Sequence, residues 1–182
     1  MISRQLPSAN IEAERSPLAA TPTAPSLLAE VTRADLLGEA WAARERGWHL
    51  VCQLPDGSTP KGIRWGEGPS PPWDEIKEWI HEHCRLAMHL GKSRLAVLDV
   101  DFQRGGKIPD GLPRTPIVST PSGGWHVYFR HTHVEGDKQN TTIAPGVELK
   151  SGKALIPIVG SIKTVDGSVR GSYEWLVSPD AC

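Results

Sequence analysis

Two aspartates, Asp99 and Asp101, are the first residues whose types and spacing could do chemistry. They follow an apolar run that is typical of a strand covered on both faces. Since side chains alternate along a strand, we expect both carboxylates on one face, roughly 7 Å apart at the backbone. Hard divalent ions such as Mg²⁺ or Mn²⁺ prefer oxygen ligands of this kind. The pair therefore indicates a metal site, although a solvated strand end has the same pattern.

A second polar group follows the turn Ser122-Gly123-Gly124. Alternation places His126, Tyr128 and Arg130 on one strand face, which we expect to be polar, with the residues between them on the core face. Backbone N–H groups of a glycine-rich turn can bind phosphate oxygens, and His and Arg can add charge-assisted hydrogen bonds. This segment predicts a cradle for a triphosphate, and the alternative is a hairpin with an exposed histidine.

A third acid, Glu148, lies between two apolar residues that point the other way. It shares its predicted face with Lys150. Glu148 could supply a third carboxylate to the Asp pair. Taken alone, however, a surface glutamate paired with a nearby lysine is the commoner arrangement.

The elements that must position these residues divide the chain into a helical first part and a strand-rich second part. Residues 1–31 are rich in Pro, Ser, Ala and Thr, which predicts a flexible lead-in. Thr32, with an acid three positions on, predicts the start of a helix that ends near Gly47. Apolar spacing predicts a second helix over residues 74–90, ended by Gly91.

Short apolar segments predict the strands, at residues 48–54, 94–101, 117–120, 125–130, 145–150, 154–159 and 173–177. A chain of 182 residues is enough for one ordinary domain, which we place at residues 32–182. The expected fold class is α+β, with an α/β first part leading into a mostly β second part.

The composition excludes several classes of protein. The 20 Lys plus Arg and 21 Asp plus Glu nearly cancel, so no global positive field is available and a polyanion must be bound locally. No stretch approaches the 18 consecutive apolar residues typical of a membrane span. The three cysteines are an odd, widely spaced set, which argues against a disulfide framework and fits a reducing compartment.

Tryptophan is unusually frequent, with seven residues against two Tyr and two Phe. Trp41, Trp79 and Trp125 fall on predicted core faces. Trp65 and Trp73 fall in a Pro/Gly-rich segment, which makes them candidates to stack on unpaired bases of a template.

The order of these motifs is more specific than any one of them. It resembles the primase–polymerase (Prim-Pol) domain of bifunctional DNA primase/polymerases, in the archaeo-eukaryotic primase superfamily. The motifs that carry the resemblance are Asp99-x-Asp101, the segment TPSGGWHVYF at 120–129, Gly146-Val-Glu148 and GSYEW at 171–175. The resemblance covers roughly residues 32–177. It implies an N-terminal α/β module packed on an RRM-like sheet, with the active site between them.

The resemblance also implies residue roles. The acids of the first and third motifs would hold two divalent ions, Mg²⁺ or Mn²⁺, and the second-motif histidine would contact the nucleotide phosphates. The implied metal ligands are Asp99, Asp101 and Glu148, and the implied nucleotide contacts are His126, Ser122, Gly123, Gly124, Arg130, Tyr128, Lys150 and Lys163. The third motif departs from the family, which often has Asp followed by Arg where this chain has Glu148 and Lys150.

The implied activity is that of a DNA primase and DNA polymerase. Such an enzyme transfers nucleotides from nucleoside triphosphates to a 3′-hydroxyl under the direction of a single-stranded DNA template, and also makes primers. Expected partners are template, primer, nucleoside triphosphates and a helicase region, on the same full-length chain or in trans. We expect a fragment of a larger replication protein of phage or plasmid type, acting in the cytoplasm of a prokaryotic or phage-infected cell.

Two other functions remain open from the sequence. A metal-dependent glycosyltransferase could use Asp99-x-Asp101 to hold a nucleotide sugar, although the His126 motif is not expected for it. A non-catalytic module could bind single-stranded DNA through exposed tryptophans. Such a module has no evident need for three acids opposite a histidine and a glycine turn.

Overall fold

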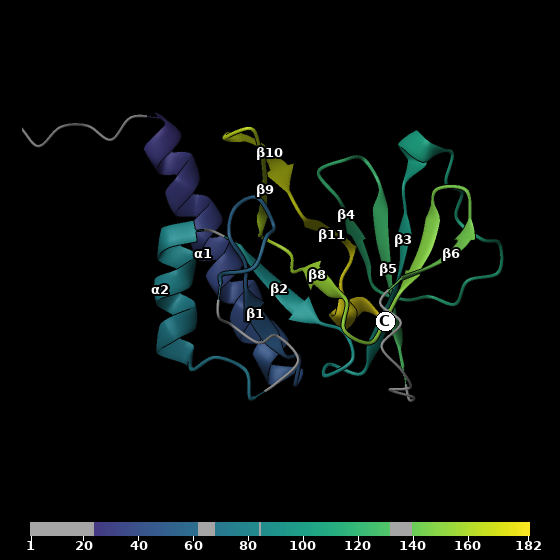
Figure 1. Ribbon diagram of the computed structural model, residues 1–182, viewed down its shortest axis with the longest axis horizontal. Helices are drawn as coiled ribbons and strands as arrows, with labels where there is room; N and C mark the ends of the chain where they lie inside the picture. Colours follow the sequence, from purple (N-terminus) through teal and green to yellow (C-terminus); the bar gives the residue numbers. More distant parts are fainter. Residues whose placement is uncertain (1–23, 62–67, 84, 132–139) are drawn as a thin grey trace, which may run out of the picture.

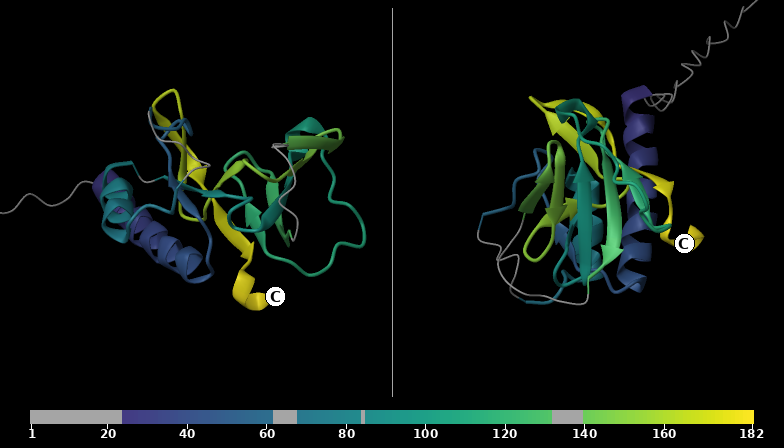
Figure 2. Two further views of the ribbon diagram at one scale, coloured as in Figure 1. Left: turned by 60° about the horizontal axis from the view of Figure 1, so that its bottom comes forward. Right: turned by 90° about the vertical axis from the view of Figure 1, so that its right-hand side faces the viewer.

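The chain folds as three layers in the computed structural model, which describes residues 24–61, 68–83, 85–131 and 140–182. Two helices lie against a three-stranded sheet, and a six-stranded sheet lies beyond it (Figure 1). The left view of Figure 2 shows the helices on one side of the molecule and the six-stranded sheet on the other, and the right view looks onto the six-stranded sheet with the helices behind it. The predicted α+β class is confirmed in this mixture of two helices and antiparallel sheets.

The helices and strands follow one another along the chain, with the longer connections at residues 53–72 and 101–116. In order they are α1 (Ala24–Glu45), β1 (Leu50–Cys52), α2 (Trp73–His83), β2 (Leu86–His89), β3 (Leu95–Val100), β4 (Ile117–Ser119), β5 (Trp125–Arg130), β6 (Asn140–Ala144), β7 (Val147–Lys150), β8 (Leu155–Pro157), β9 (Ile162–Val165), β10 (Ser168–Ser172) and β11 (Glu174–Val177). Short 3₁₀ helices span Phe102–Arg104 and Pro179–Ala181. The strand orders are β1-β2-β8, β10-β9 and β11-β4-β5-β3-β7-β6, and every pairing is antiparallel.

One apolar core joins the helices to both larger sheets. Leu36 of α1 and Ile76 of α2 are fully buried in it, together with Met88 from the middle strand of the small sheet. Val97 of β3 reaches the same core from the six-stranded sheet. A smaller cluster around Val100 covers the other face of β3. Because both faces of β3 are covered, its sequence is the continuous apolar run expected of a central strand.

The first helix begins earlier than the sequence predicted. It starts at Ala24, so Thr32 lies inside the helix instead of capping it. Pro25 is the second helical residue, a position that tolerates proline because the first N–H groups of a helix have no partner within it. The predicted end is confirmed, because α1 stops at Glu45 and Gly47 has a φ of +74°.

The second helix is shorter than predicted. It ends at His83, and Leu86–His89 forms the strand β2, which is buried along its whole length between β1 and β8. The apolar residues 86–90 fit both a helical face and a buried strand, and tertiary pairing decides in favour of the strand.

Several other elements differ from the sequence predictions. The strands β6, β9 and β10 were not predicted: β6 and most of β10 are exposed and mostly polar, and the four residues of β9 do not alternate between apolar and polar. Trp41 was expected in the core but is 50% exposed, with its ring edge-to-face against Trp73. Trp79 and Trp125 are partly buried. No helix in the described ranges is long and apolar enough to cross a membrane.

Candidate active site

Three chemistry-bearing side chains form one row across the middle of the six-stranded sheet. Asp99 on β3 pairs in register with His126 on β5 and with Glu148 on β7. Residues that face each other in an antiparallel sheet point to the same side. The antiparallel register therefore brings together residues that lie far apart in the sequence.

A lysine ammonium lies between the two acids of this row. Lys150 Nζ is 3.1 Å from Asp99 Oδ2 and 3.2 Å from Glu148 Oε2. Burial of the ammonium opposes its charge, but the two carboxylates outweigh burial and raise the pKa of Lys150 above its ordinary value. Lys150 is therefore a charged internal counterion of the acid pair.

Asp101 lies just beyond the end of β3 and has a different environment. Its carboxylate caps the 3₁₀ helix Phe102–Arg104, with Oδ1 accepting hydrogen bonds from the backbone N–H groups of Gln103 (3.0 Å) and Arg104 (3.3 Å). Arg104 Nε lies 3.3 Å from the other carboxylate oxygen. Asp101 thus helps to fold the loop that follows β3, in addition to its predicted role as a ligand.

Two glycines hold that loop against the strand of Glu148. Gly146, at a φ of +66°, precedes β7, and its O accepts a hydrogen bond of 2.8 Å from the Asp101 N–H. A Cβ on Gly146 would lie 2.4 Å from Gly106 N and 2.7 Å from Asp101 O. Only glycine allows this approach, which keeps Asp101 beside the Glu148 strand.

His126 is a neutral, almost fully buried histidine. It is 5% exposed, and burial lowers its pKa to about 4 against the opposing effect of Asp99. Its Nε2 lies 3.6 Å from Asp99 Oδ1, and its buried Nδ1 has no hydrogen-bond partner among the described residues. The ring stacks on Tyr173 at 5.7 Å between centroids. An imidazole that is neutral near pH 7 keeps one N–H and one acceptor nitrogen.

The glycine turn between β4 and β5 is formed as predicted, but it is not an open phosphate cradle. The Gly123 N–H donates to Thr120 O (2.9 Å), and the Gly124 N–H donates to Thr120 Oγ1 (3.0 Å). A Cβ on Gly124 would lie 2.4 Å from Val100 O, so this glycine serves close packing against β3. The turn thus uses both N–H groups itself in this structure, and the expected phosphate contacts of Gly123 and Gly124 stay predictions.

Ser122 connects this turn to two other segments. Lys163 Nζ of β9 donates to Ser122 Oγ at 2.6 Å, and Gln103 Nε2 donates to Ser122 O at 2.9 Å. The β9–β10 hairpin and the loop after Asp101 therefore both meet the turn at Ser122. The structure brings predicted Lys163 to the predicted turn, although nothing in the spacing indicated that contact.

Two predicted nucleotide contacts, Tyr128 and Arg130, lie away from the row. Tyr128 is buried, stacks on Trp48 at 6.2 Å and contacts Trp175 at 5.9 Å. Burial raises its pKa above the ordinary value for a phenol. The expectation of a polar face on β5 is wrong, because His126 and Tyr128 are both buried there, the first under Tyr173 and the second against Trp48. Arg130 is exposed at the far end of β5, opposite Leu95.

The two predicted template-stacking tryptophans have different outcomes. Trp73 is the first residue of α2 and packs on Trp41, on the helical side of the molecule. Trp65 lies outside the described residues.

Two aromatic residues of the site were not predicted. Tyr173 covers His126. Phe102 directly follows Asp101, is 38% exposed and contacts Trp125 edge-to-face at 5.5 Å. The adjacency of Phe102 to Asp101 was visible in the sequence, but its exposure depends on the 3₁₀ helix. Tyr173 belongs to the GSYEW motif, but its contact with His126 joins distant segments and could not be read from that motif.

Comparison with known families agrees with this geometry. The model of the family described as "Bifunctional DNA primase/polymerase, N-terminal" (Prim-Pol) matches residues 39–182. The chain belongs to this family. The resemblance drawn from the four motifs is confirmed, and the family is one of DNA primase/polymerase enzymes, which act on DNA and nucleotides. No curated protein matches the chain, and the comparison gives no support to the expected helicase partner.

The Prim-Pol family implies a divalent metal, and part of the site fits one. Asp99 and Glu148 already share one cation, the Lys150 ammonium, and their oxygens are the ligands that Mg²⁺ and Mn²⁺ prefer. Within the described part of the chain, no three His, Cys, Asp or Glu side chains converge closely enough to hold a metal ion. A metal at the acid pair would therefore compete with Lys150 for the two carboxylates.

Proposed function

We propose that this Prim-Pol domain carries out template-directed nucleotidyl transfer from nucleoside triphosphates to a 3′-hydroxyl, including primer synthesis. The observation that carries the proposal is the in-register row of His126, Asp99 and Glu148, with Lys150 as counterion of the two acids. The row places a cation-binding acid pair beside a polar group that has an unpartnered nitrogen. Family membership supports the same chemistry.

The proposed roles follow from charge and position. Asp99 and Glu148, with Asp101 nearby, would hold divalent ions, which supply activation of the 3′-hydroxyl and neutralise triphosphate charge. Lys150, which lies two residues after Glu148 in β7, would then leave the acids and bind a phosphate oxygen. Lys163 would bind phosphate beside Ser122. Positioning and charge neutralisation are the main contributions of protein groups to phosphoryl transfer.

In this proposal, side-chain groups bind the phosphates, and the backbone N–H groups of the glycine turn do not. The Gly123 and Gly124 N–H groups are already bonded to Thr120, whereas the Lys150 and Lys163 ammonium groups can exchange their present partners for phosphate. His126 would contact a phosphate through its buried Nδ1, which has no partner among the described residues. In this proposal Ser122 positions Lys163.

The arrangement of modules supports an active site between them. The row lies on the face of the six-stranded sheet that packs toward the three-stranded sheet and the helices, because Val97 and Tyr128 on that face belong to the shared core. We assign the six-stranded sheet to the RRM-like module of the family and the helices with β1, β2 and β8 to the α/β module.

Template stacking is assigned to Phe102 as well as to the tryptophans predicted from sequence. Phe102 is exposed, adjoins Asp101 and is braced by Trp125. Arg104, whose side chain is 79% exposed, adds positive charge to the same loop. An exposed ring beside a cation is the usual platform for an unpaired base.

The test is a nucleotide-incorporation assay on wild-type protein and the isosteric variant Asp99→Asn. With Mg²⁺ or Mn²⁺, a primed template and an unprimed template, we expect Asp99→Asn to lose at least about 100-fold in rate, because losing one ligand costs several kcal/mol. Asp110→Asn, an exposed loop aspartate with the same charge change, should keep full activity. Thermal unfolding of both variants controls for loss of fold.

Two results would contradict the proposal. Wild-type rates in Asp99→Asn would show that the row is not the catalytic site. Single-stranded DNA binding by the wild-type protein with no incorporation under any metal would instead support a non-catalytic module. Turnover of nucleotide sugars, assayed in parallel, would support the glycosyltransferase.

A further inference from the structure

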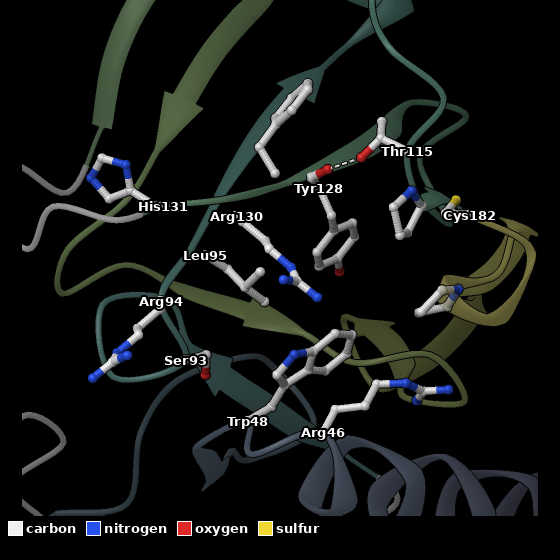
Figure 3. Close-up of a pocket in the computed structure, with 13 residues that line it drawn as sticks. Arg46, Trp48, Ser93, Arg94, Leu95, Thr115, Tyr128, Arg130, His131 and Cys182 are labelled. Carbon is white, nitrogen blue, oxygen red and sulfur yellow. Dashed lines mark hydrogen bonds between the residues drawn. The ribbon is translucent and has the colours of Figure 1, made fainter.

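A cavity lies between the modules, at the end of the central strands away from Asp99. Its volume is about 800 Å³, and it is lined by residues from the end of α1, the start of β3, the end of β5 and the C-terminal 3₁₀ helix (Figure 3). Leu95 and Arg130, which pair in register, lie at this end of the sheet. Asp99 lies four positions after Leu95 along the strand, which is a distance of about 13 Å. The cavity is therefore separate from the acid row.

The cavity has a strongly positive lining. Arg46, Arg94 and Arg130 all line it, and none of the lining residues is an aspartate or glutamate. The guanidinium groups of Arg94 and Arg130 have no hydrogen-bond or ion-pair partner among the described residues, although the Arg94 backbone is hydrogen-bonded to Gly91 and His131. In Figure 3 the Arg130 guanidinium points into the space beside Tyr128 and Trp48. Guanidinium groups bind phosphate with two parallel hydrogen bonds, so unpaired arginines in a cavity favour a phosphate ligand.

Arg46 supplies a second, independent observation. Its Nη2 binds both carboxylate oxygens of Asp180, at 3.0 and 3.1 Å, while its Nη1 is buried and has no partner within the described residues. A buried donor without a partner costs free energy unless a ligand satisfies it. Asp180 thus occupies one edge of the Arg46 guanidinium, and the buried Nη1 donor has no partner among the described residues.

Aromatic rings form the floor of the same cavity. Arg46 lies over the Trp48 ring at 5.6 Å, and Trp48 stacks on Tyr128. The rings hold Arg46 by a cation–π contact and keep the guanidinium in a partly desolvated place, where its interaction with an anion is stronger than in water. Arginines fixed in this way form a prearranged anion site, unlike mobile arginines on an open surface.

We propose that this cavity binds a backbone phosphate of a single-stranded nucleic acid, held by Arg46 and Arg130 with Arg94 at the rim. The proposal rests on the proposed function in one respect: the nucleic-acid strand that enters the cavity is taken to be the one that continues to the acid row. The span of about 13 Å corresponds to about four nucleotides at the spacing of B-form DNA. A strand is favoured over a free nucleotide because one strand can reach both places, and because a chain with a net charge of −1 must bind polyanions locally.

The primary experiment measures the affinity for a fluorescently labelled oligo-dT 12-mer by anisotropy, with EDTA present to remove divalent ions. We expect Arg130→Ala to weaken binding about tenfold, as for one charge-assisted contact. The slope of log affinity against log salt should fall by about 0.7, as for one lost phosphate contact on a single strand. Arg130 is exposed, so its truncation should leave the unfolding temperature unchanged.

Two further variants complete the design. Lys77→Ala removes one exposed positive charge from α2 and should leave both affinity and salt slope unchanged. Asp180→Asn removes the carboxylate that competes for Arg46 and should strengthen binding severalfold. Equal affinity of wild-type protein and Arg130→Ala would overturn the proposal, as would an equal loss in Lys77→Ala.

The outcomes separate this proposal from the proposed function. Asp99→Asn should keep the affinity for oligo-dT in EDTA while losing incorporation, because the cavity does not use Asp99. If wild-type protein incorporates nucleotides but Arg130→Ala binds oligo-dT normally, the cavity proposal alone fails. If the wild-type protein is inactive but Arg130→Ala binds weakly, the proposed function alone fails. Competition by dATP and not by unlabelled oligo-dT would show a free-nucleotide site and overturn the assignment to a strand.

Discussion

Lys150 Nζ lies 3.1 Å from Asp99 Oδ2, so the best candidate metal ligand of the chain already has a cation bound to it. The same ammonium lies 3.2 Å from Glu148 Oε2. An internal positive charge offsets the electrostatic repulsion between two neighbouring carboxylates when no other cation is present. It must also be displaced, or share the acids, when a metal binds.

Replacement of Lys150 by Gln should therefore raise the affinity for Mn²⁺. Removal of the competing ammonium leaves two carboxylates without a counterion, and we expect affinity to increase about tenfold, equivalent to about 1.4 kcal/mol. Manganese binding can be measured by electron paramagnetic resonance or calorimetry, without any turnover. Lys153→Gln, a nearby replacement with the same charge change, is the control. Unchanged or weaker binding in Lys150→Gln would show that the ammonium does not compete with the metal.

His126 should make stability depend on pH. Its pKa is about 6.5 when unfolded and about 4 when folded, because burial disfavours the charged imidazole. Between pH 4 and pH 6.5 the unfolded state binds more protons than the folded state. The contribution of neutral His126 to the free energy of unfolding is therefore complete above pH 6.5 and is lost as the pH falls toward 4. The loss assigned to His126 is about 3 kcal/mol. Burial also lowers the pKa of His49 and His89, which act in the same direction.

The measurement is the free energy of unfolding in denaturant at several pH values between 4 and 7. His126→Gln should show a shallower fall with decreasing pH than wild-type protein, whatever its stability at pH 7. His81→Gln, on the exposed face of α2, should keep the wild-type slope. Parallel curves for His126→Gln and wild type would mean that His126 is protonated as easily in the folded chain as in the unfolded one.

The sequence predicted best the features that depend on local pattern. The apolar run of β3, the turn at residues 121–124 and the end of α1 at Gly47 were all predicted from residue type and spacing. The grouping of Asp99, His126 and Glu148 needed the register of three strands, which follows from tertiary pairing. Family resemblance supplied that grouping before the geometry did.

Features that depend on burial could not be predicted in the same way. Leu86–His89 has an apolar pattern that fits either period, and only the neighbouring strands β1 and β8 make it a strand. Tyr128 looked like part of a polar face because it alternates with Val127, yet the covering layer buries it. The alternation of side chains along a strand predicts which residues share a face, but it does not predict whether another layer of the fold covers that face.

Gly146→Ala should displace Asp101 as well as destabilise the fold. The added Cβ would lie 2.4 Å from Gly106 N and 2.7 Å from Asp101 O, and Gly146 has a φ of +66°. We expect a loss of about 3 kcal/mol. Gly111→Ala is the matched control, because Gly111 has a φ of +76° but open space around its Cβ position, so its replacement should cost about 1 kcal/mol.

The two glycine variants are compared by denaturant unfolding and by nucleotide incorporation below the unfolding transition. Gly146→Ala should lose activity even where it remains folded, because its backbone clash lies against Asp101. Equal stability losses in the two variants would show that the loop after Asp101 yields to the added methyl without strain.

Replacement of Phe102 and replacement of Trp73 should have opposite effects on template binding and on stability. Phe102 is 38% exposed beside Asp101, so Phe102→Ala should weaken oligo-dT binding about tenfold with little change in unfolding temperature, because one stacked base contributes about 1–3 kcal/mol. Trp73 packs on Trp41 between α1 and α2, so Trp73→Ala should lower stability by about 2 kcal/mol and leave affinity unchanged. Leu176→Ala, an exposed apolar residue of β11, controls for general loss of apolar surface. Weaker binding in Trp73→Ala with normal binding in Phe102→Ala would return template stacking to the tryptophan predicted from sequence.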